Sequence, residues 1–213
     1  MTIRLSDIQS GKGGFIIVGE SKWDLAGATV AGGGDVNGDG FADLVLGAEL
    51  RDRPGVLDAG AAYVVFGGPA LADRINLSEV AAGNGGFTIL GRARLDYAGM
   101  SIGGGGDING DGYADAIVGA HFADRPGTAD TGAVFVIYGG ATPAAVVDLR
   151  TLSANSAGFE IRGENSNDLT GWSSASAGDI NGDGIGDVAI GAIANSQYAQ
   201  WAGAAYVVFG EAG

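Results

Sequence analysis

Three short segments of the sequence carry the side chains best suited to chemistry. Each reads Asp-x-Asn-Gly-Asp-Gly-x-x-Asp, and the three begin at Asp35, Asp107 and Asp179. Oxygen ligands at positions 1, 3 and 5 can curl a loop around one cation, and glycines permit the left-handed turns that such a loop needs. A set of about six to eight oxygen ligands, with no nitrogen or sulfur, favours Ca²⁺ over Mg²⁺ and over a transition metal.

We therefore predict three Ca²⁺ sites per chain, one in each of these acidic loops. The side chains at positions 1, 3, 5 and 9 would bind the ion, and position 7 would offer only its backbone carbonyl, which lets its side chain vary. The predicted ligands are Asp35, Asn37, Asp39, Phe41 and Asp43; Asp107, Asn109, Asp111, Tyr113 and Asp115; and Asp179, Asn181, Asp183, Ile185 and Asp187. The alternative is a turn rich in Asp, Asn and Gly that binds nothing. Three copies with every ligand kept favour calcium.

The elements that must position these loops repeat along the chain every 72 residues. Landmarks outside the loops keep the same step: Leu5, Leu77 and Leu149; Phe15, Phe87 and Phe159; Asp24, Asp96 and Asp168. A fixed period of this length is typical of repeat architectures. We expect one domain over residues 1–213, with repeats at approximately 1–72, 73–144 and 145–213.

Each repeat contains about four short strand-like segments. In the first repeat these are Phe15–Val18, Ala28–Gly33, Leu44–Ala48 and Ala61–Phe66, all bounded by Gly or Asp turns. The last two are continuously apolar, so both of their faces should be covered. Residues 71–81 are the only stretch that could form a short helical turn in place of a strand. Stacked four-stranded sheets around an axis form a β-propeller, and we predict this all-β fold.

Composition excludes several classes of protein. The net charge is −14, and nine of the 25 acidic residues lie in the three loops, so binding to nucleic acid or to an anionic membrane is not expected. The apolar runs fall far short of a membrane span, so no membrane insertion is expected. Cysteine is absent, and the N-terminal residues lack the apolar core of a signal peptide.

Taken together, these motifs resemble the FG-GAP repeat of the integrin α-subunit N-terminal β-propeller and of its bacterial relatives. The Phe-Gly element is Phe66-Gly67, Tyr138-Gly139 and Phe209-Gly210, and the Gly-Ala-Pro element is Gly47-Ala48, Gly119-Ala120 and Gly191-Ala192 without its proline. The resemblance implies blades of four antiparallel strands with calcium in the loop that joins the first two. It also implies an adhesion or recognition role at the cell surface or outside the cell, without catalysis.

Other polar and aromatic residues have less specific interpretations. His121, the single histidine, is expected to be a surface loop residue, and the three repeated Asp residues at 24, 96 and 168 are expected to accept hydrogen bonds from loop backbone. Trp23, Trp172 and Trp201 lie in or beside loops. They could anchor a ligand or pack between blades.

Three functional hypotheses remain open at this point. The first is a calcium-stabilised binding or adhesion module that presents a protein or glycan ligand site on its loops. The second is a designed or excised repeat fragment with a purely structural role in propeller assembly. The third is a propeller with hydrolase activity at its central channel, although the sequence has no Ser-His-Asp set and no phosphate-binding loop to support it.

The strand count predicts how the chain assembles. Propellers usually have about four to eight blades, and this chain encodes three. Residues 15–18 would form an outer strand without a blade in front of it, and residues 172–209 would form a blade without its outer strand. We therefore expect a head-to-tail homodimer in which each N-terminal strand completes the partner's last blade, giving six blades. The alternative is a piece of a longer, seven-bladed parent.

Overall fold

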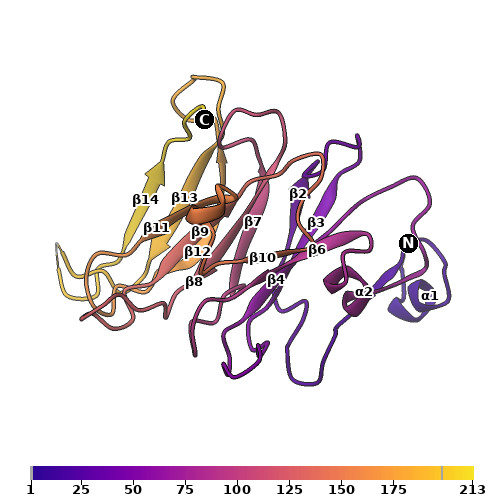
Figure 1. Ribbon diagram of the computed structural model, residues 1–213, viewed down its shortest axis with the longest axis horizontal. Coiled ribbons are helices and arrows are strands. Elements are labelled where there is room, and N and C mark those ends of the chain that lie inside the picture. Colours follow the sequence, from indigo (N-terminus) through magenta and orange to yellow (C-terminus); the bar gives the residue numbers. More distant parts are fainter. Residues whose placement is uncertain (1, 198) are drawn as a thin grey trace.

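The computed structural model describes residues 2–197 and 199–213. These residues form short β-strands with two five-residue α-helices and one 3-10 turn, so the fold is all-β as expected. Figure 1 shows the sheets side by side in sequence order, from helix α1 (Leu5–Gln9) at one end to the last strand at the other. Within the described residues, no helix is long and apolar enough to cross a membrane.

Three antiparallel sheets make up most of the chain, consistent with propeller blades. The first contains β2 (Val30–Gly34), β3 (Asp43–Ala48), β4 (Ala61–Val65) and β6 (Gly86–Leu90), in that order, and the short strand β10 (Val146–Asp148) adds to β6 in parallel. The second contains β7 (Ser101–Gly106), β8 (Asp115–Ala120), β9 (Ala133–Ile137) and β11 (Gly158–Arg162). The third contains β12 (Thr170–Gly178), β13 (Asp187–Ala192) and β14 (Ala204–Val208).

A separate two-stranded sheet precedes the first blade-like sheet. It pairs β1 (Ile16–Val18) with β5 (Arg74–Asn76) in parallel. The helix α2 (Leu77–Ala81) lies within the segment where the sequence allows a helical turn. The sequence did not indicate α1, β5, β10 or the 3-10 turn at Ser153–Asn155, because three to five residues are too few for a periodic pattern to develop.

Apolar side chains fill the space between neighbouring sheets. Val64 and Phe135 are buried together between the first and second sheets, and Val136 and Ile190 are buried between the second and third. Tyr63 packs with α2 and β1 on the other face of the first sheet. The central strands are therefore covered on both faces, which explains their continuous apolar runs, and each large side chain buried in this way contributes about 1.5–3 kcal/mol.

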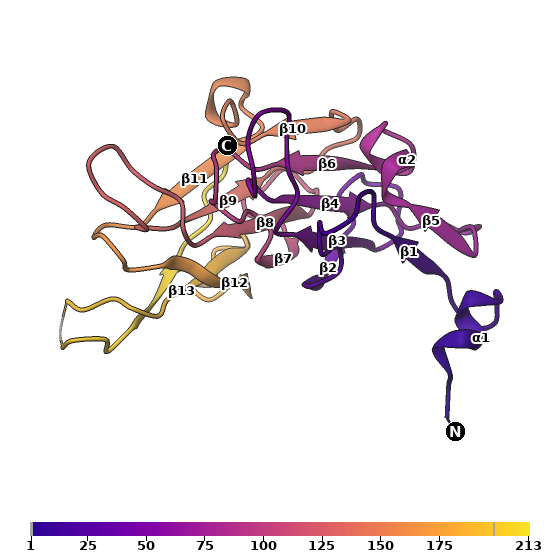
Figure 2. The ribbon, with the colours of Figure 1, turned by 90° about the horizontal axis from the view of Figure 1, so that it is seen from below.

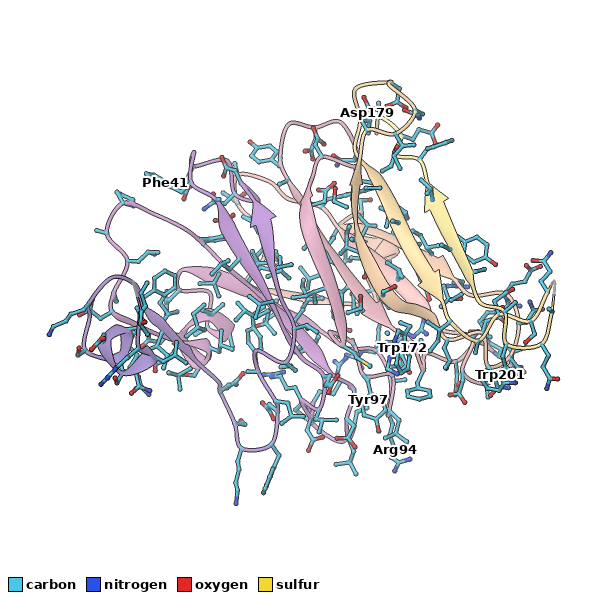
Figure 3. The ribbon with its side chains drawn as sticks, turned by 180° about the vertical axis from the view of Figure 1, so that it is seen from behind. Phe41, Arg94, Tyr97, Trp172, Asp179 and Trp201 are labelled. Carbon is cyan, nitrogen blue, oxygen red and sulfur yellow. The ribbon has the colours of Figure 1, made fainter. Side chains whose placement is uncertain are left out.

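The strands direct two sets of loops to opposite ends of the sheets. Figure 2 shows β2, β7 and β12 along one side of the fan and β6, β10 and β11 along the other. In Figure 3 Phe41 and Asp179 mark the end that carries the acidic loops, while Arg94, Tyr97, Trp172 and Trp201 mark the opposite end. The second set of loops, which follows β1, β3, β6, β8, β11 and β13, forms what we call the opposite loop face.

Candidate metal centres and the opposite loop face

Each acidic loop joins the first and second strands of its sheet. In the first loop the Asp35 carboxylate accepts hydrogen bonds from the backbone N–H groups of Asp39 at 3.0 Å and Gly40 at 2.8 Å. The Asp39 carboxylate accepts another from the N–H of Phe41 at 2.9 Å. Gly38 and Gly40 adopt φ angles of 75° and 88°, which glycine reaches without strain. The local sequence therefore curls the loop around its own side-chain oxygens.

The second and third loops repeat this arrangement. The Asp107 carboxylate accepts from the N–H of Asp111 at 3.0 Å, and the Asp179 carboxylate accepts from the N–H of Asp183 at 3.1 Å. In all three loops the Asn amide at position 3 donates to the Asp carboxylate at position 5, at distances of 2.9, 2.8 and 2.7 Å. The structure thus brings positions 1, 3 and 5 together in every repeat.

The Asp at position 9 has a different environment, because it begins the second strand and is buried. The two Asp43 oxygens accept from the N–H groups of Val36 and Gly67, each at 2.8 Å. Asp115 and Asp187 make the same pair of bonds in their repeats. Each carboxylate therefore links the loop to the Phe-Gly element that ends the third strand. Burial raises the pKa of Asp115 to about 7, although these backbone hydrogen bonds act to lower it.

The donors at each loop fit a hard cation in chemical type. They are carboxylate, amide and carbonyl oxygens, and a carboxylate oxygen that accepts one hydrogen bond keeps a further lone pair. Among the described residues, however, no group of three or more His, Cys, Asp or Glu side chains lies close enough to hold a metal ion. In this arrangement the carboxylates accept backbone hydrogen bonds instead. Calcium binding at the fifteen residues named above stays a prediction.

The side chain at position 7 has a packing role that the sequence did not reveal. A Cβ atom built on Gly38 would lie 2.5 Å from the Tyr113 ring, so this ring covers the preceding loop. Ile185 covers Gly110 in the same way, at 3.6 Å. Phe41 is the equivalent residue of the first repeat, and it is 41% exposed. Position 7 therefore connects consecutive acidic loops.

On the opposite loop face, four aromatic rings form a cluster. The His121 ring centroid lies 4.2 Å from that of Phe122 and 4.9 Å from that of Trp172, which meets it edge-on. Tyr97 stacks on His121 at 6.3 Å. Figure 3 shows Tyr97 and Trp172 close together at this end. Each ring comes from a position that the other repeats fill differently, and this break in the repeat is the signal that could have identified the cluster.

The expectation that His121 is a surface loop residue is wrong. Its side chain is only 2% exposed, and its Nδ1 atom has no hydrogen-bond partner. Desolvation by burial lowers its pKa to about 4, so the ring is neutral at pH 7. Tyr97 and Trp172 pack against the ring from an earlier loop of the same repeat and from the next repeat, so the sequence next to His121 does not reveal its burial.

A groove opens beside this cluster. Arg94, Leu95, Tyr97, Phe122, Asp124 and Asp130 line a cavity of about 440 Å³. Its walls combine two aromatic rings with one guanidinium and two carboxylates. This mixture of flat apolar surface and charged groups is suited to binding a polar ligand rather than a purely apolar one.

The repeated Asp residues and the tryptophans are placed as follows. Asp96 accepts from the N–H of Ala93 at 3.1 Å, and Asp168 accepts from that of Asn165 at 3.3 Å, which confirms their predicted role in binding loop backbone. Asp24 differs, because its Oδ2 atom is buried without a hydrogen-bond partner. Trp23 and Trp201 are 73% and 67% exposed, so neither packs between sheets within the chain.

Comparison with known proteins agrees with this geometry. The FG-GAP repeat family matches residues 26–65, 98–137 and 171–208, which together make up more than half of the chain. The sequence is 31% identical to the phosphatidylinositol-glycan-specific phospholipase D of Bos taurus over 160 residues, which cover 74% of this chain and 17% of that protein. It is 28% identical to integrin alpha-PS2 of Drosophila melanogaster over 173 residues, covering 76% of this chain and 11% of that protein.

Integrin alpha-5 of Xenopus laevis is 33% identical over 110 residues, which cover 52% of this chain and 10% of that protein. The chain thus spans less than a fifth of the length of each of these three relatives. Each family match begins just before or within the first strand of a sheet and ends in the third strand, so each includes one acidic loop. The chain belongs to the FG-GAP repeat family.

Proposed function

We propose that this chain forms three blades of a β-propeller, binds one Ca²⁺ in each acidic loop, and uses the opposite loop face to bind a protein or glycan ligand. The observation that carries the proposal is the repetition of one hydrogen-bonded loop geometry in three family repeats. The module would act in adhesion or recognition and would have no catalytic activity of its own. Its similarity to integrin alpha chains supports a location outside the cell or at its surface.

Calcium has a defined physical role in this proposal. Each loop holds three carboxylates within nine residues, and their mutual repulsion opposes the turn when no cation is present. A bound ion would neutralise that repulsion, and through the position-9 carboxylate it would also secure the Phe-Gly end of the third strand. The ion would therefore stabilise the sheet as well as the loop.

Metal counting tests the calcium sites. We expect Asp39→Ala, Asp111→Ala and Asp183→Ala each to lose one of three bound Ca²⁺ ions in native mass spectrometry. Glu79→Gln, an exposed acidic residue outside the loops, serves as the matched control and should keep all three. Retention of three ions by any of the Asp variants would contradict the ligand assignment.

The opposite loop face supports the binding part of the proposal. Partly exposed aromatic rings beside charged groups, as at Tyr97 and Phe122, are typical of positions that dominate binding energy. The groove lined by Arg94 and Tyr97 offers a surface on which a sugar ring or a peptide side chain could stack, with Asp124 and Asp130 as hydrogen-bond acceptors. Hydrolysis has less support, because the ring contacts of His121 are aromatic.

Binding to immobilised glycan and peptide arrays tests this face. We expect a ligand whose binding falls at least tenfold in the double variant Tyr97→Ala/Phe122→Ala. Trp201→Ala, which removes an exposed aromatic ring outside this groove, is the control and should bind normally. No binding on either array, or equal binding by the double variant, would contradict the proposal that this face binds a ligand.

A further inference from the structure

Consecutive acidic loops are joined through their backbones. The Ala114 N–H, at position 8 of the second loop and next to the buried Asp115, donates to the Asp35 carbonyl of the first loop at 3.0 Å. One repeat later the Gly186 N–H donates to the Asp107 carbonyl at 2.8 Å. Each loop therefore holds the backbone of position 1 in the loop before it, and the side chain at position 1 is a predicted calcium ligand.

The Phe-Gly element makes a second link between consecutive loops. The Gly139 N–H donates to the Asp115 carboxylate, and the next N–H, that of Gly140, donates to the Val36 carbonyl of the first loop, each at 2.9 Å. The same pair of bonds recurs one repeat later at residues 210–211. Two consecutive residues thus connect position 9 of one loop to position 2 of the loop before it.

Glycine is required in this element because two loops approach it. A Cβ atom built on Gly139 would lie 2.6 Å from the Val36 carbonyl oxygen of the first loop and 2.9 Å from the Cβ atom of Tyr113 in the second. On Gly210 it would lie 2.6 Å from the Ile108 carbonyl oxygen. A side chain at either position would push the two loops apart, so glycine allows their close contact.

The side chain at position 7 supplies a third link. The Tyr113 ring of the second loop covers Gly38 of the first, and Ile185 of the third loop covers Gly110 of the second. Both covered glycines lie at position 4, between the predicted ligands at positions 3 and 5. Within the described residues, none of these three kinds of link joins the first loop to the third.

We propose that the three acidic loops bind Ca²⁺ cooperatively and that the second loop couples the other two. This inference rests on the proposed calcium sites. When positions 1, 3, 5 and 9 of one loop are held around an ion, the position-8 N–H and the Phe-Gly element are held with them. These groups in turn fix the position-1 and position-2 carbonyls of the preceding loop. That loop then has less conformational freedom to lose when it takes its own ion.

Such a linkage acts equally in both directions, so a filled first loop favours binding at the second as much as the reverse. Figure 3 shows Phe41 and Asp179, which mark the first and third loops, at opposite sides of the end that carries the acidic loops. Since these two loops share none of the links, each acts on the other only through the second. Coupling between linked sites typically changes affinity by about 5–150-fold, so we expect at least fivefold.

Vacating an end loop or the middle loop gives a matched pair of variants. Asp39→Ala and Asp111→Ala each remove one carboxylate and one site, but only Asp39→Ala leaves two linked loops. Native mass spectrometry over a range of free calcium resolves chains with one and two ions. After correction for statistics, the second ion should bind Asp39→Ala at least fivefold more tightly than the first, and Asp111→Ala no more tightly than the first.

The outcomes separate this inference from the calcium sites themselves. Two ions that bind both variants independently would overturn the coupling and leave the sites in place. A chain that binds no calcium would overturn the proposed function, and the coupling with it. Circular dichroism checks that each variant is folded. Asn37→Ala and Asn109→Ala, which remove the amide ligand without changing the charge, give the same comparison if an Asp variant does not fold.

Hydrogen exchange tests the link without counting ions. In Asp39→Ala the first loop has lost its site, so calcium can order its backbone only through the second loop. Calcium should therefore slow amide exchange in residues 36–42 at least fivefold. The control Asp39→Ala/Asp111→Ala keeps only the third site, and calcium should leave the exchange of these residues unchanged. Equal exchange with and without calcium in Asp39→Ala, while two ions are bound, would overturn the inference.

Discussion

Strands β4 and β14 have the same sequence, Ala-Ala-Tyr-Val-Val, and different surroundings. Strand β4 lies between β3 and β6 and has sheets or helices over both faces, so all five of its residues are buried. Strand β14 pairs only with β13 in the described chain, and three of its five residues are exposed. The residues of a strand indicate what kind of surroundings suit it, but the position of the strand in the assembly decides whether it has them.

The two tyrosines of these strands show the consequence for polar groups. The Tyr63 hydroxyl donates to Glu20 Oε2 at 2.7 Å, and the Arg51 guanidinium pairs with the same oxygen at 2.9 Å. Desolvation by burial raises the pKa of Tyr63 well above its usual value. The Tyr206 hydroxyl accepts instead from the Asn195 amide at 3.3 Å. The same side chain therefore joins a buried charged network in one strand and a loop amide in the other.

The acidic loops provide the opposite case, since they have the same geometry in all three repeats. Removing calcium should therefore have the largest effect and should act on every repeat at once. If each site binds with a Kd of ~0.1 mM, millimolar Ca²⁺ stabilises the fold by ~1.5 kcal/mol per site and by about 4–5 kcal/mol in total. Thermal unfolding with and without EDTA measures this. An unchanged melting curve after verified calcium removal would mean that the loops are turns without a metal.

Placing one charge in each of the two matched strands tests the comparison directly. Val64→Asp buries an unpaired carboxylate and should lower the free energy of unfolding by about 3–5 kcal/mol. Val207→Asp puts the same charge on a half-exposed position and should cost less than about 0.5 kcal/mol within a single chain. Urea unfolding in dilute solution gives both values. Similar losses for the two variants would show that β14 is covered even in the monomer.

Most of the fold could be predicted from the sequence because the repeat supplies each pattern three times. The strands of the first repeat begin and end within two residues of their expected positions, and each acidic loop lies where its motif placed it. The cluster of Tyr97, His121 and Trp172 could not be predicted in this way. Its members come from three different segments and occur once each, so only the packing of neighbouring sheets brings them together.

The extra strand β10 at the outer edge of the first sheet explains a smaller difference between the first and second repeats. Arg53 donates to both oxygens of Asp148, at 3.2 and 2.9 Å, and this aspartate lies on β10 at the outer edge of the first sheet. The equivalent Arg125 binds only backbone carbonyls, those of Gly163 and Glu164. Arg53→Ala should therefore destabilise by about 1–2 kcal/mol, and Arg125→Ala by about 0.5 kcal/mol. Equal values in urea unfolding would mean that β10 contributes no stabilising ion pair.

The last expected effect concerns the protonation of His121, whose buried surroundings shift its pKa far from the usual histidine value. Its counterpart Ile193 is exposed, whereas His121 is enclosed by aromatic rings. Because it is the only histidine, its ring proton signal in NMR can be followed without assignment, and the midpoint should be about 4. Below pH 6.5 the unfolded chain binds this proton before the folded chain does. The free energy of unfolding should therefore fall by up to about 3 kcal/mol as the pH drops from 6.5 to 4, and this group should cause no further loss below that pH.

The variant Trp172→Ala tests whether burial is the cause of the low His121 pKa. Removing the ring that meets His121 edge-on admits water to the imidazole, and water favours the charged form. The midpoint should then move upward from about 4 towards the ordinary histidine value of about 6.5. Trp201→Ala removes an exposed ring elsewhere on the same loop face and should leave the titration unchanged. A native midpoint near 6.5 would contradict the burial of His121, and with it the rigid aromatic cluster on which the proposed ligand face depends.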